Sequence, residues 1–394
     1  MRVLLLGAAG WEGREMAKGL AQSQDISHII AADIRADRVQ RIASDIGAKV
    51  SAQVVDVNDK QHLVSLMKEV DLVANCVGPY YRYMIPVLEA VMEAKVNYID
   101  IADSADPTLD AIERYDEVAK SAGITVLLGM GDGPGLDNVL CRYAIDRLDK
   151  VEKIHVYWCT HWGAGGGGYA AALQGYFMYK GISRQILDGR EVEVPAGTGA
   201  EIVEFPDGVL ECRYCREPEP ITLSRYAQRR GKGPVKEAYN KGGVAPQLMI
   251  DNQLKLKELG FDDEEPIHIK GDTSVAPLDV AIRVMSKYAS SVDLGEPWAG
   301  WKNEVIGEKE GKKVSYITTP AKSSEVLTKP MEALTAHCAV VAAIMFARGE
   351  ITEKGVLPPE ECVDPTLFLP RLTKEVGMPI IETEIATGSK QIFP

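Results

Sequence analysis

A glycine-rich turn near the start of the chain carries the clearest chemical signal in the sequence. Gly7, Gly10 and Gly13 follow a short apolar run and precede a helical pattern. Gly7 permits a tight turn, Gly10 lets the backbone approach a pyrophosphate, and Gly13 lets the helix pack on the strand. The N–H groups and partial positive charge at a helix start favour a bound phosphate. Because Trp11 and Glu12 stand in the same turn, the segment predicts a dinucleotide-binding site that includes all five residues.

A carboxylate stands where the ribose of such a dinucleotide is usually read. Asp33 ends the second expected strand, 20 residues after Gly13. A carboxylate at this spacing accepts hydrogen bonds from both adenosine ribose hydroxyls and repels a 2′-phosphate. NAD is therefore the expected cofactor. Arg35 and Arg38 follow directly and could hold a 2′-phosphate instead, so NADP stays open as the alternative.

Two further strand ends are expected at the same edge of the sheet. Asp56 and Val57 close the third expected strand, where such folds commonly contact adenine. Cys76, Val77 and Gly78 follow the fourth, and Gly78 with the next proline permits a turn beneath the ribose and nicotinamide. A nucleophilic cysteine needs an exposed, electropositive site, which the sequence does not indicate. We therefore interpret Cys76 as a small strand residue beside the cofactor.

The first 130 residues alternate between short apolar runs and helical patterns. Strands that alternate with helices in this way form parallel sheets covered on both faces. Dinucleotides bind at the carboxyl edge of such sheets. The segment predicts an α/β fold with a doubly wound, Rossmann-type parallel sheet. The expected strands lie at 3–6, 29–32, 54–55, 72–76, 98–99 and 126–128, and the expected helices at 12–22, 36–46, 60–68, 84–94 and 107–122.

The pattern changes beyond residue 135. A linking helix is expected at 136–148 and a long strand at 151–160. Strand-like runs separated by turns dominate 191–215, and the runs 302–306 and 313–318 predict a hairpin. Residues 136–329 therefore predict a second, α+β domain that carries an antiparallel sheet. The cleft between two such domains is the expected active site.

The composition argues against several classes of protein. The 394 residues contain 44 basic and 57 acidic side chains, a formal net charge of −13. This balance repels phosphate backbones, so nucleic acid is not an expected partner. No apolar run reaches the roughly 18 residues of a membrane span, and the start of the chain does not resemble a secretory leader. We expect a cytoplasmic protein that binds a small molecule.

The seven cysteines of the chain are scattered and odd in number. Free thiols are typical of a reducing compartment such as the cytoplasm. Cys212 and Cys215 form a CxxC pair, but no second pair at zinc spacing accompanies them. We interpret both as ordinary strand residues, and no metal is expected.

Three segments at the expected strand ends share the pattern of a known family. They read Asn-Cys-Val-Gly-Pro-Tyr at 75–80, Tyr-Ile-Asp-Ile-Ala-Asp at 98–103 and Gly-Met-Gly-Asp-Gly-Pro-Gly-Leu at 129–136. These segments resemble the saccharopine dehydrogenase family. Segments elsewhere resemble its lysine 6-dehydrogenase-like branch, so the resemblance covers nearly the whole chain. They lie at 192–196, 217–223, 240–243, 347–350 and 355–361.

The resemblance implies a reaction and a domain organisation. Members of the family oxidise an amine, or reduce the matching imine, with a nicotinamide cofactor. The tail 330–394 is expected to return and complete the dinucleotide-binding domain of residues 1–135, while the second domain offers a surface for a homodimer. We expect an NAD(P)-dependent oxidoreductase that acts on a C–N bond of an amino acid or opine-type amine. An enoyl-type reductase of the same family and a non-catalytic NAD-binding sensor stay open as alternatives.

Amine oxidation requires a base, because an ammonium has no lone pair with which to expel a hydride. Asp103 follows the fifth expected strand, where the family's cleft begins, and either binds the ammonium, accepts its proton or caps the next helix. His161 ends a strand, and imidazole suits proton transfer at neutral pH. Tyr80 follows the glycine–proline turn and either faces the nicotinamide or packs in the core. These three residues are the catalytic candidates, and Asp103 or His161 is the expected base.

Overall fold

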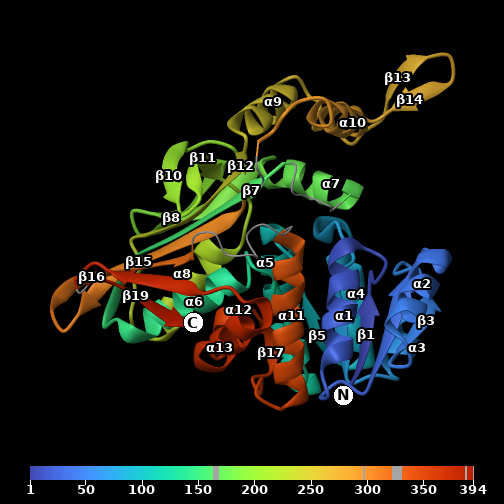
Figure 1. Cartoon of the computed structure of the whole chain (residues 1–394), viewed down its shortest axis with the longest axis horizontal. Helices are drawn as coiled ribbons and strands as arrows, with labels where there is room; N and C mark the ends of the chain where they lie inside the picture. Colours follow the sequence, from blue (N-terminus) through green and yellow to red (C-terminus); the bar gives the residue numbers. More distant parts are fainter. Residues whose placement is uncertain (163–167, 296–297, 322–330, 387, 394) are drawn as a thin grey trace.

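The computed structural model describes residues 1–162, 168–295, 298–321, 331–386 and 388–393, which form two large sheets (Figure 1). The first sheet has seven parallel strands in the order β17-β6-β5-β4-β1-β2-β3. The order changes direction between β1 and β4, and ligands of doubly wound sheets bind at such a point. The predicted α/β, Rossmann-type fold is confirmed. Its strands are β1 (Arg2–Leu6), β2 (His28–Asp33), β3 (Val50–Val54), β4 (Leu72–Asn75), β5 (Asn97–Asp100), β6 (Thr125–Leu127) and β17 (Gly355–Leu357).

Helices cover both faces of this sheet, because successive residues of each strand point to opposite sides. On β1, Val3 and Leu5 pack against one group of helices, whereas Leu4 and Leu6 pack against the other. The first group contains α1 (Trp11–Gln22), α2 (Ala36–Ile46) and α11 (Met331–Ala347), and the second contains α3 (Lys60–Met67), α4 (Tyr80–Ala94) and α5 (Ala105–Ala122). Both faces of the strands are therefore buried.

Two elements begin four residues before their predicted start, whereas the other boundaries of the parallel sheet and its helices agree within two residues. β3 starts at Val50 rather than near residue 54, because the half-buried Ser51 and Gln53 interrupt the apolar run on this edge strand. α4 starts at Tyr80 rather than at Met84, so that it follows directly on the turn after β4. This helix start lies at the carboxyl edge of the sheet, beside the expected cofactor groove.

The second sheet has ten strands and a mixed direction. β15 (Gly300–Lys309) and β16 (Lys312–Pro320) form the predicted hairpin, and β7 (Lys150–His161) is the predicted long strand. Most pairs are antiparallel, but β7 pairs with β12 (Glu237–Ala245) in parallel. The prediction of an antiparallel sheet is therefore corrected to a mixed one. Helices α6 (Leu136–Arg147) and α8 (Glu219–Arg229) pack on this sheet, whose other strands are β8 (Ile182–Leu187), β9 (Arg190–Pro195), β10 (Glu201–Phe205) and β11 (Gly208–Tyr214).

The end of the chain is shared between the two sheets. Helix α11 packs on α1, and β17 adds to the edge of the parallel sheet beside β6. After α12 (Pro359–Cys362) and α13 (Pro365–Val376), β18 (Ile380–Glu384) pairs with β16, and β19 (Gly388–Phe393) pairs with β18. The tail therefore returns to the nucleotide-binding part as far as α13, and its last two strands belong to the second sheet.

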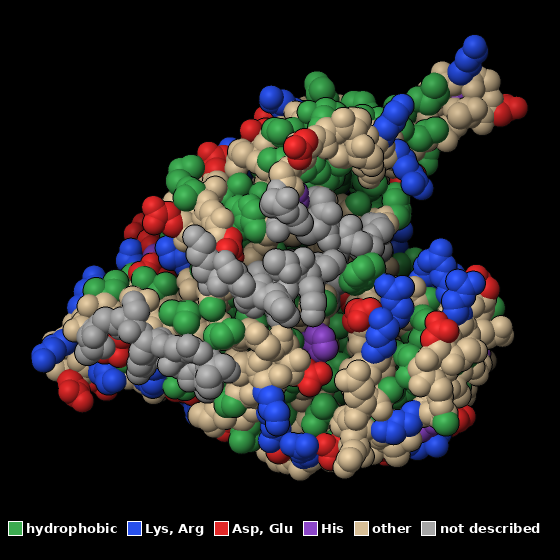
Figure 2. Space-filling model, in the orientation of Figure 1, with side chains coloured by type: hydrophobic (Ala, Val, Ile, Leu, Met, Phe, Trp, Pro, Cys, Tyr) green, Lys and Arg blue, Asp and Glu red, His purple; other side chains and the backbone are tan. Residues whose placement is uncertain are grey.

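An arm extends from the second sheet above the carboxyl edge of the first (Figure 1). It consists of α9 (Gln247–Glu258), the hairpin β13 (Ile267–Lys270) and β14 (Thr273–Val275), and α10 (Pro277–Ala289), next to α7 (Gly168–Met178). Figure 2 shows Lys and Arg side chains on the side of the nucleotide-binding part that faces this arm, with a notch between the two. Tyr81 Oη of α4 donates a hydrogen bond to Glu264 Oε1, between α9 and β13 (3.0 Å).

Among the described residues, no helix is long and apolar enough to span a membrane. All seven cysteines are free thiols, and Cys215 Sγ lies 3.0 Å from Asn240 Oδ1. In the same described ranges, no cluster of three or more His, Cys, Asp or Glu side chains is placed to hold a metal ion.

Candidate active site

A groove of about 640 Å³ runs along the carboxyl edge of the parallel sheet, at the point where the strand order changes direction. The loops after β1, β2, β3 and β4 form its walls. All the predicted cofactor residues except Gly13 line it, namely Gly7, Gly10, Trp11, Glu12, Asp33, Arg35, Asp56, Val57, Cys76, Val77 and Gly78. Residues from four separate strand ends therefore share one groove.

The glycine turn leaves room for a phosphate where side chains would block it. Gly7 has φ +75°, and a Cβ there would lie 2.7 Å from the carbonyl oxygen of Cys76. A Cβ on Gly13 would lie 2.3 Å from the carbonyl oxygen of Gly7, so Gly13 sits beneath the turn. Gly10 is the N-cap of α1, has no side-chain cap, and faces mostly open space. The first N–H groups of α1 thus remain available to an anion, and the residues present fit a dinucleotide.

Asp33 holds the glycine turn and an arginine at the same time. Its Oδ2 accepts a hydrogen bond from the N–H of Ala9 (3.1 Å). Arg35 donates to Oδ1 from its backbone N–H and its Nε, both at 3.0 Å, and from Nη2 to Oδ2 at 3.3 Å. The Asp33 carboxylate is buried, whereas the Arg35 side chain is 42% exposed. The group expected to read the ribose is thus paired with the group expected to read a 2′-phosphate.

A buried polar network supports the loops beside this groove. Asn75 Nδ2 donates to Tyr98 Oη (2.9 Å), which donates to Asp100 Oδ2 (2.9 Å). Asp100 Oδ1 accepts from the N–H groups of Ala102 (3.1 Å) and Gly129 (2.7 Å). Burial raises the pKa of Asp100 to about 6 although these hydrogen bonds oppose the shift. The network ties the ends of β4, β5 and β6 together beneath the groove.

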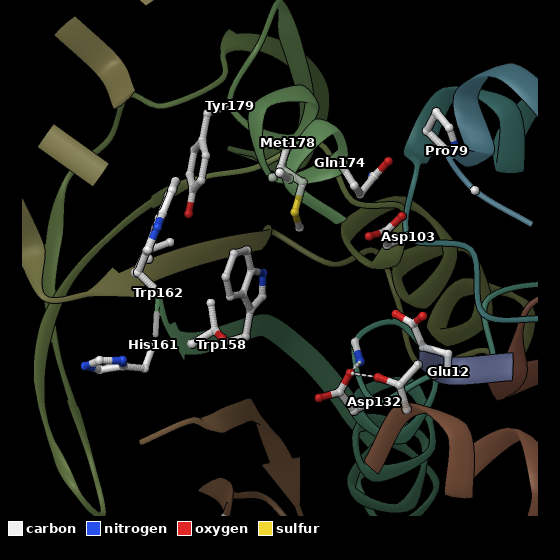
Figure 3. Close-up of a pocket in the computed structure, with 18 of the residues that line it drawn as sticks. Glu12, Pro79, Asp103, Asp132, Trp158, His161, Trp162, Gln174, Met178 and Tyr179 are labelled. Carbon is white, nitrogen blue, oxygen red and sulfur yellow. Dashed lines mark hydrogen bonds between the residues drawn. The ribbon is translucent and has the colours of Figure 1, made fainter. Parts of the chain in front are cut away.

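A second cavity, of about 840 Å³, opens from the inner end of the groove. The two share Glu12, Cys76, Gly78 and Tyr169, so a molecule in the cavity would meet the inner end of a bound dinucleotide. Residues of β7, α7, α10 and α11 and the loops after β5 and β6 complete its walls (Figure 3). The cavity therefore lies between the two sheets and is the candidate substrate site.

Five carboxyl groups line this cavity: Glu12, Asp103, Asp132, Asp137 and Glu217. Burial is the main cause of a raised pKa at each of them, and the like charges of neighbouring carboxylates add to the shift at Asp103. The pKa of Asp103 rises to about 7 and that of Asp132 to about 6. Among the described lining residues, Arg283 is the only Lys or Arg, and it is exposed on α10. Acidic side chains therefore dominate the charged groups among the described residues of this cavity.

Asp103 faces the shared end of the cavity. Its Oδ1 is buried and has no hydrogen-bond partner among the described residues. Figure 3 shows its carboxylate on the same side of the cavity as Glu12 and Asp132. Asp132 is held in place by the hydroxyl of Thr335, which donates to its Oδ1 (2.9 Å). The N-cap of α5 is Ser104, so the cap position does not fall on Asp103.

The other two catalytic candidates also line the cavity, but their polar atoms are already engaged. The Tyr80 hydroxyl is buried and donates to the carbonyl oxygen of Asn75 (3.0 Å), and burial raises its pKa well above 10. His161 ends β7, and its Nε2 lies 2.9 Å from the carbonyl oxygen of Leu294. In Figure 3 its ring points away from Asp103 and Glu12. Of the three candidates, Asp103 has the free acceptor atom.

Aromatic side chains form the opposite wall of the cavity. Trp158 of β7 lies with Trp162, Tyr179 and Met178 across from the carboxylates (Figure 3). The indole Nε1 of Trp158 donates to Glu217 Oε2 (2.9 Å). Trp162, which follows His161 directly, is the one member of this wall that the sequence indicated as a wall of the substrate pocket. Trp158, Tyr179 and Met178 were not expected there.

The sequence reasoning missed six of the lining residues described above, although two of them had a usable signal: Asp132, Asp137, Trp158, Met178, Tyr179 and Glu217. Asp132 and Glu217 fall within motifs that carry the family resemblance, so their positions could have been examined as site residues. Asp137 and Tyr179 stand in ordinary helical patterns. Nothing in their spacing shows that distant segments bring them to the same cavity.

The fold and the site together define a nicotinamide-dinucleotide-dependent oxidoreductase with a separate substrate domain. The model of the saccharopine dehydrogenase NADP binding domain matches residues 3–127, and that of the saccharopine dehydrogenase C-terminal domain matches residues 184–378. The chain belongs to the saccharopine dehydrogenase family. Its enzyme class and its use of NAD(P) are confirmed, while the narrower lysine 6-dehydrogenase-like branch stays a prediction.

Three relatives match over almost the whole chain. Carboxynorspermidine synthase from Vibrio alginolyticus is 26% identical over 406 residues, covering 94% of each chain. Carboxyaminopropylagmatine dehydrogenase from Synechocystis is 25% identical over 403 residues, covering 96% of each. The structure of the L-Glu-forming saccharopine dehydrogenase from Saccharomyces cerevisiae has a TM-score of 0.72 at 14% identity and covers 98% of this chain and 99% of its own. This last likeness concerns the fold.

A more distant relative matches only a third of the chain. Trans-acting enoyl reductase from Mycobacterium tuberculosis is 25% identical over 132 residues, which cover 33% of this chain and 32% of the enoyl reductase. The match leaves about two thirds of the chain unmatched.

Proposed function

We propose that the protein makes or breaks a C–N bond at the oxidation level of amine and imine, in an opine-type secondary amine or an amino acid. The observation that carries this proposal is the set of five carboxyl groups that line the cavity, with the unpartnered Oδ1 of Asp103 among them. A cationic amine would neutralise these carboxylates, whereas an isolated buried charge is costly.

Asp103 is the residue that we assign as the base. In the oxidative direction, a proton leaves the substrate ammonium for Asp103, and the lone pair on nitrogen then forms the C=N bond as hydride leaves the carbon. In the reductive direction, Asp103 returns the proton to nitrogen. A bound nicotinamide supplies or accepts the hydride. A pKa near 7 suits this role, because both protonation states are then populated near neutral pH.

Glu12 and Asp132 assist by charge rather than by proton transfer. Both carboxylates lie beside Asp103 at the shared end of the cavity (Figure 3). Their negative potential attracts the substrate ammonium and raises the pKa of Asp103. The aromatic wall on the opposite side excludes water from the reacting C–N bond.

The enoyl-type alternative fits the cavity less well. A neutral enoyl substrate would leave these five carboxyl groups, two of them buried and three half-buried, without a partner of opposite charge. Two relatives that match over almost the whole chain are named for carboxynorspermidine and carboxyaminopropylagmatine, both amines. These names support an amine substrate and leave open which amine this chain uses.

A turnover screen tests the proposal. Purified protein is mixed with NADH or NADPH, one amine and one 2-oxo acid or aldehyde, and the loss of absorbance at the reduced nicotinamide band is followed. Enoyl thioesters form the comparison set. We expect turnover with an amine–carbonyl pair and loss of it in Asp103→Asn. If the protein turns over enoyl thioesters but none of the amine–carbonyl pairs, the assignment is wrong.

A further inference from the structure

We propose that Glu217, Trp158 and Tyr179 form a second cation subsite in the cavity, which holds a positively charged group of the substrate other than the reacting nitrogen. This inference rests on the proposed function, because it assumes that an amine occupies the cavity. It narrows the substrate class to amines with at least two cationic nitrogens. The Asp103 side of the cavity holds one, and the aromatic wall holds the other.

Glu217 is a buried carboxyl group without a cationic partner in the protein. It is 2% exposed and lies just before α8. Its Oε2 accepts from Trp158 Nε1 (2.9 Å) and from the thiol of Cys215 (3.7 Å). Among the described residues, its Oε1 has no hydrogen-bond partner and no Lys, Arg or His forms an ion pair with it. An acceptor for Trp158 alone would not need a charge, since a neutral amide oxygen would serve as well.

Tyr179 provides an independent sign of a missing ligand. Its side chain is 2% exposed, and its hydroxyl is buried without a hydrogen-bond partner among the described residues. Figure 3 shows this hydroxyl pointing into the cavity, between Trp162 and Met178. Buried polar atoms are nearly always satisfied, so an orphan that faces a cavity indicates a group that arrives with the ligand. An ammonium N–H is a donor that this oxygen accepts.

The surrounding rings suit a cation as well. The rings of Trp158 and Tyr179 are tilted by 45° with their centroids 6.4 Å apart. Both line the cavity, and the faces of such rings attract ammonium groups. The thioether of Met178 adds an apolar surface for the alkyl chain between the two nitrogens. A carboxylate, a free hydroxyl and two rings together are the usual surroundings of a bound ammonium group.

Binding of diamines against matched monoamines tests the subsite without requiring turnover. Isothermal titration calorimetry on the full chain with saturating NADP compares α,ω-diaminoalkanes of three to five carbons with 1-aminoalkanes of equal chain length. We expect the diamines to bind about tenfold to a hundredfold more tightly, as for a hydrogen-bonded charge pair. Glu217→Gln should reduce this preference to about threefold or less while leaving monoamine binding unchanged.

Two further variants make the test specific. Glu219→Gln changes a neighbouring buried carboxyl group that does not line the cavity, and should keep the diamine preference. Tyr179→Phe removes only the hydroxyl and should weaken diamines but not monoamines, which also covers the case in which Glu217→Gln fails to fold. Equal affinity for diamines and monoamines in the wild type, or a preference that survives both Glu217→Gln and Tyr179→Phe, would overturn the subsite. Failure of the proposed function gives a different result, namely binding without turnover of any amine pair.

Discussion

The pair formed by Asp33 and Arg35 decides how the adenosine end of the groove selects its cofactor. A carboxylate offers about four acceptor positions. At Asp33, one is taken by the N–H of Ala9 and three by Arg35. Ribose hydroxyls can therefore bind this carboxylate only after the Arg35 side chain has moved. The same side chain is positioned to bind a 2′-phosphate.

Arg35→Ala should shift the protein towards NAD. The mutation frees two acceptor positions on Asp33, and breaking an ion pair whose arginine is 42% exposed costs at most about 1 kcal/mol. We therefore expect NAD to bind up to about fivefold more tightly. Loss of a charged hydrogen bond to the 2′-phosphate, worth about 1.5–3 kcal/mol, should weaken NADP roughly tenfold to a hundredfold. The ratio of the two dissociation constants should change by more than tenfold in favour of NAD.

Fluorescence titration of NADH and NADPH measures both constants on the same preparation. Asp33→Ala is the reciprocal control, because it removes the ribose acceptor, frees Arg35 and should shift the ratio towards NADP. Arg38→Ala tests whether the other groove arginine contributes. If Arg35→Ala weakens NADH and NADPH by the same factor, then Arg35 acts through the shape of the turn and the reasoning fails.

Three further predictions follow from the geometry. Gly10→Ala should abolish dinucleotide binding, measured by calorimetry, and leave the melting temperature unchanged. Gly13→Ala, whose Cβ would lie 2.3 Å from Gly7 O, should instead lower the melting temperature. If the two variants show the reverse, the phosphate binds elsewhere. The rate of amine oxidation should fall as the pH drops below about 7, because Asp103 must be unprotonated. Asp103→Asn should lower kcat/KM by about 10²–10⁴-fold and abolish this fall of the rate at acidic pH. Burial raises the pKa of Glu219 well above its usual value, so the stability it gives is present at low pH and is lost as the pH rises towards that pKa. Glu219→Gln should therefore raise the melting temperature at pH 8 and change it little at pH 4, and equal effects at both pH values would contradict this.

The dinucleotide groove could be predicted because its signals are local. Gly7, Gly10 and Gly13 specify a strand–turn–helix unit within a few residues, and Asp33 marks the end of the next strand. Once strand and helix alternate, the topology of a parallel sheet brings the strand ends to one edge. Ten of the eleven lining residues that were expected there come from such strand ends and turns, and the eleventh, Arg35, follows Asp33 directly.

The hydrogen-bond partners of the predicted residues and the pairing of the strands depend on contacts that short sequence patterns do not show. Asp33 and Arg35 were expected to offer two alternative specificities, but the structure pairs them with each other. His161 ends its strand as expected, yet its Nε2 meets the carbonyl oxygen of Leu294, 133 residues further along the chain. The mixed direction of the second sheet likewise arises from the parallel pairing of β7 with β12, which are separated by most of that domain.

The sequence by itself determined the class of fold, the cofactor groove and the family, because periodicity and short motifs depend on neighbouring residues. Only the tertiary structure decided the substrate cavity. Glu12, Asp103, Asp132 and Glu217 come from four different segments, and none of these segments shows by itself that its carboxyl group meets the other three. Their chemistry depends on this assembly, because burial raises the pKa of each carboxyl group. The like charges of the neighbouring carboxylates raise it further.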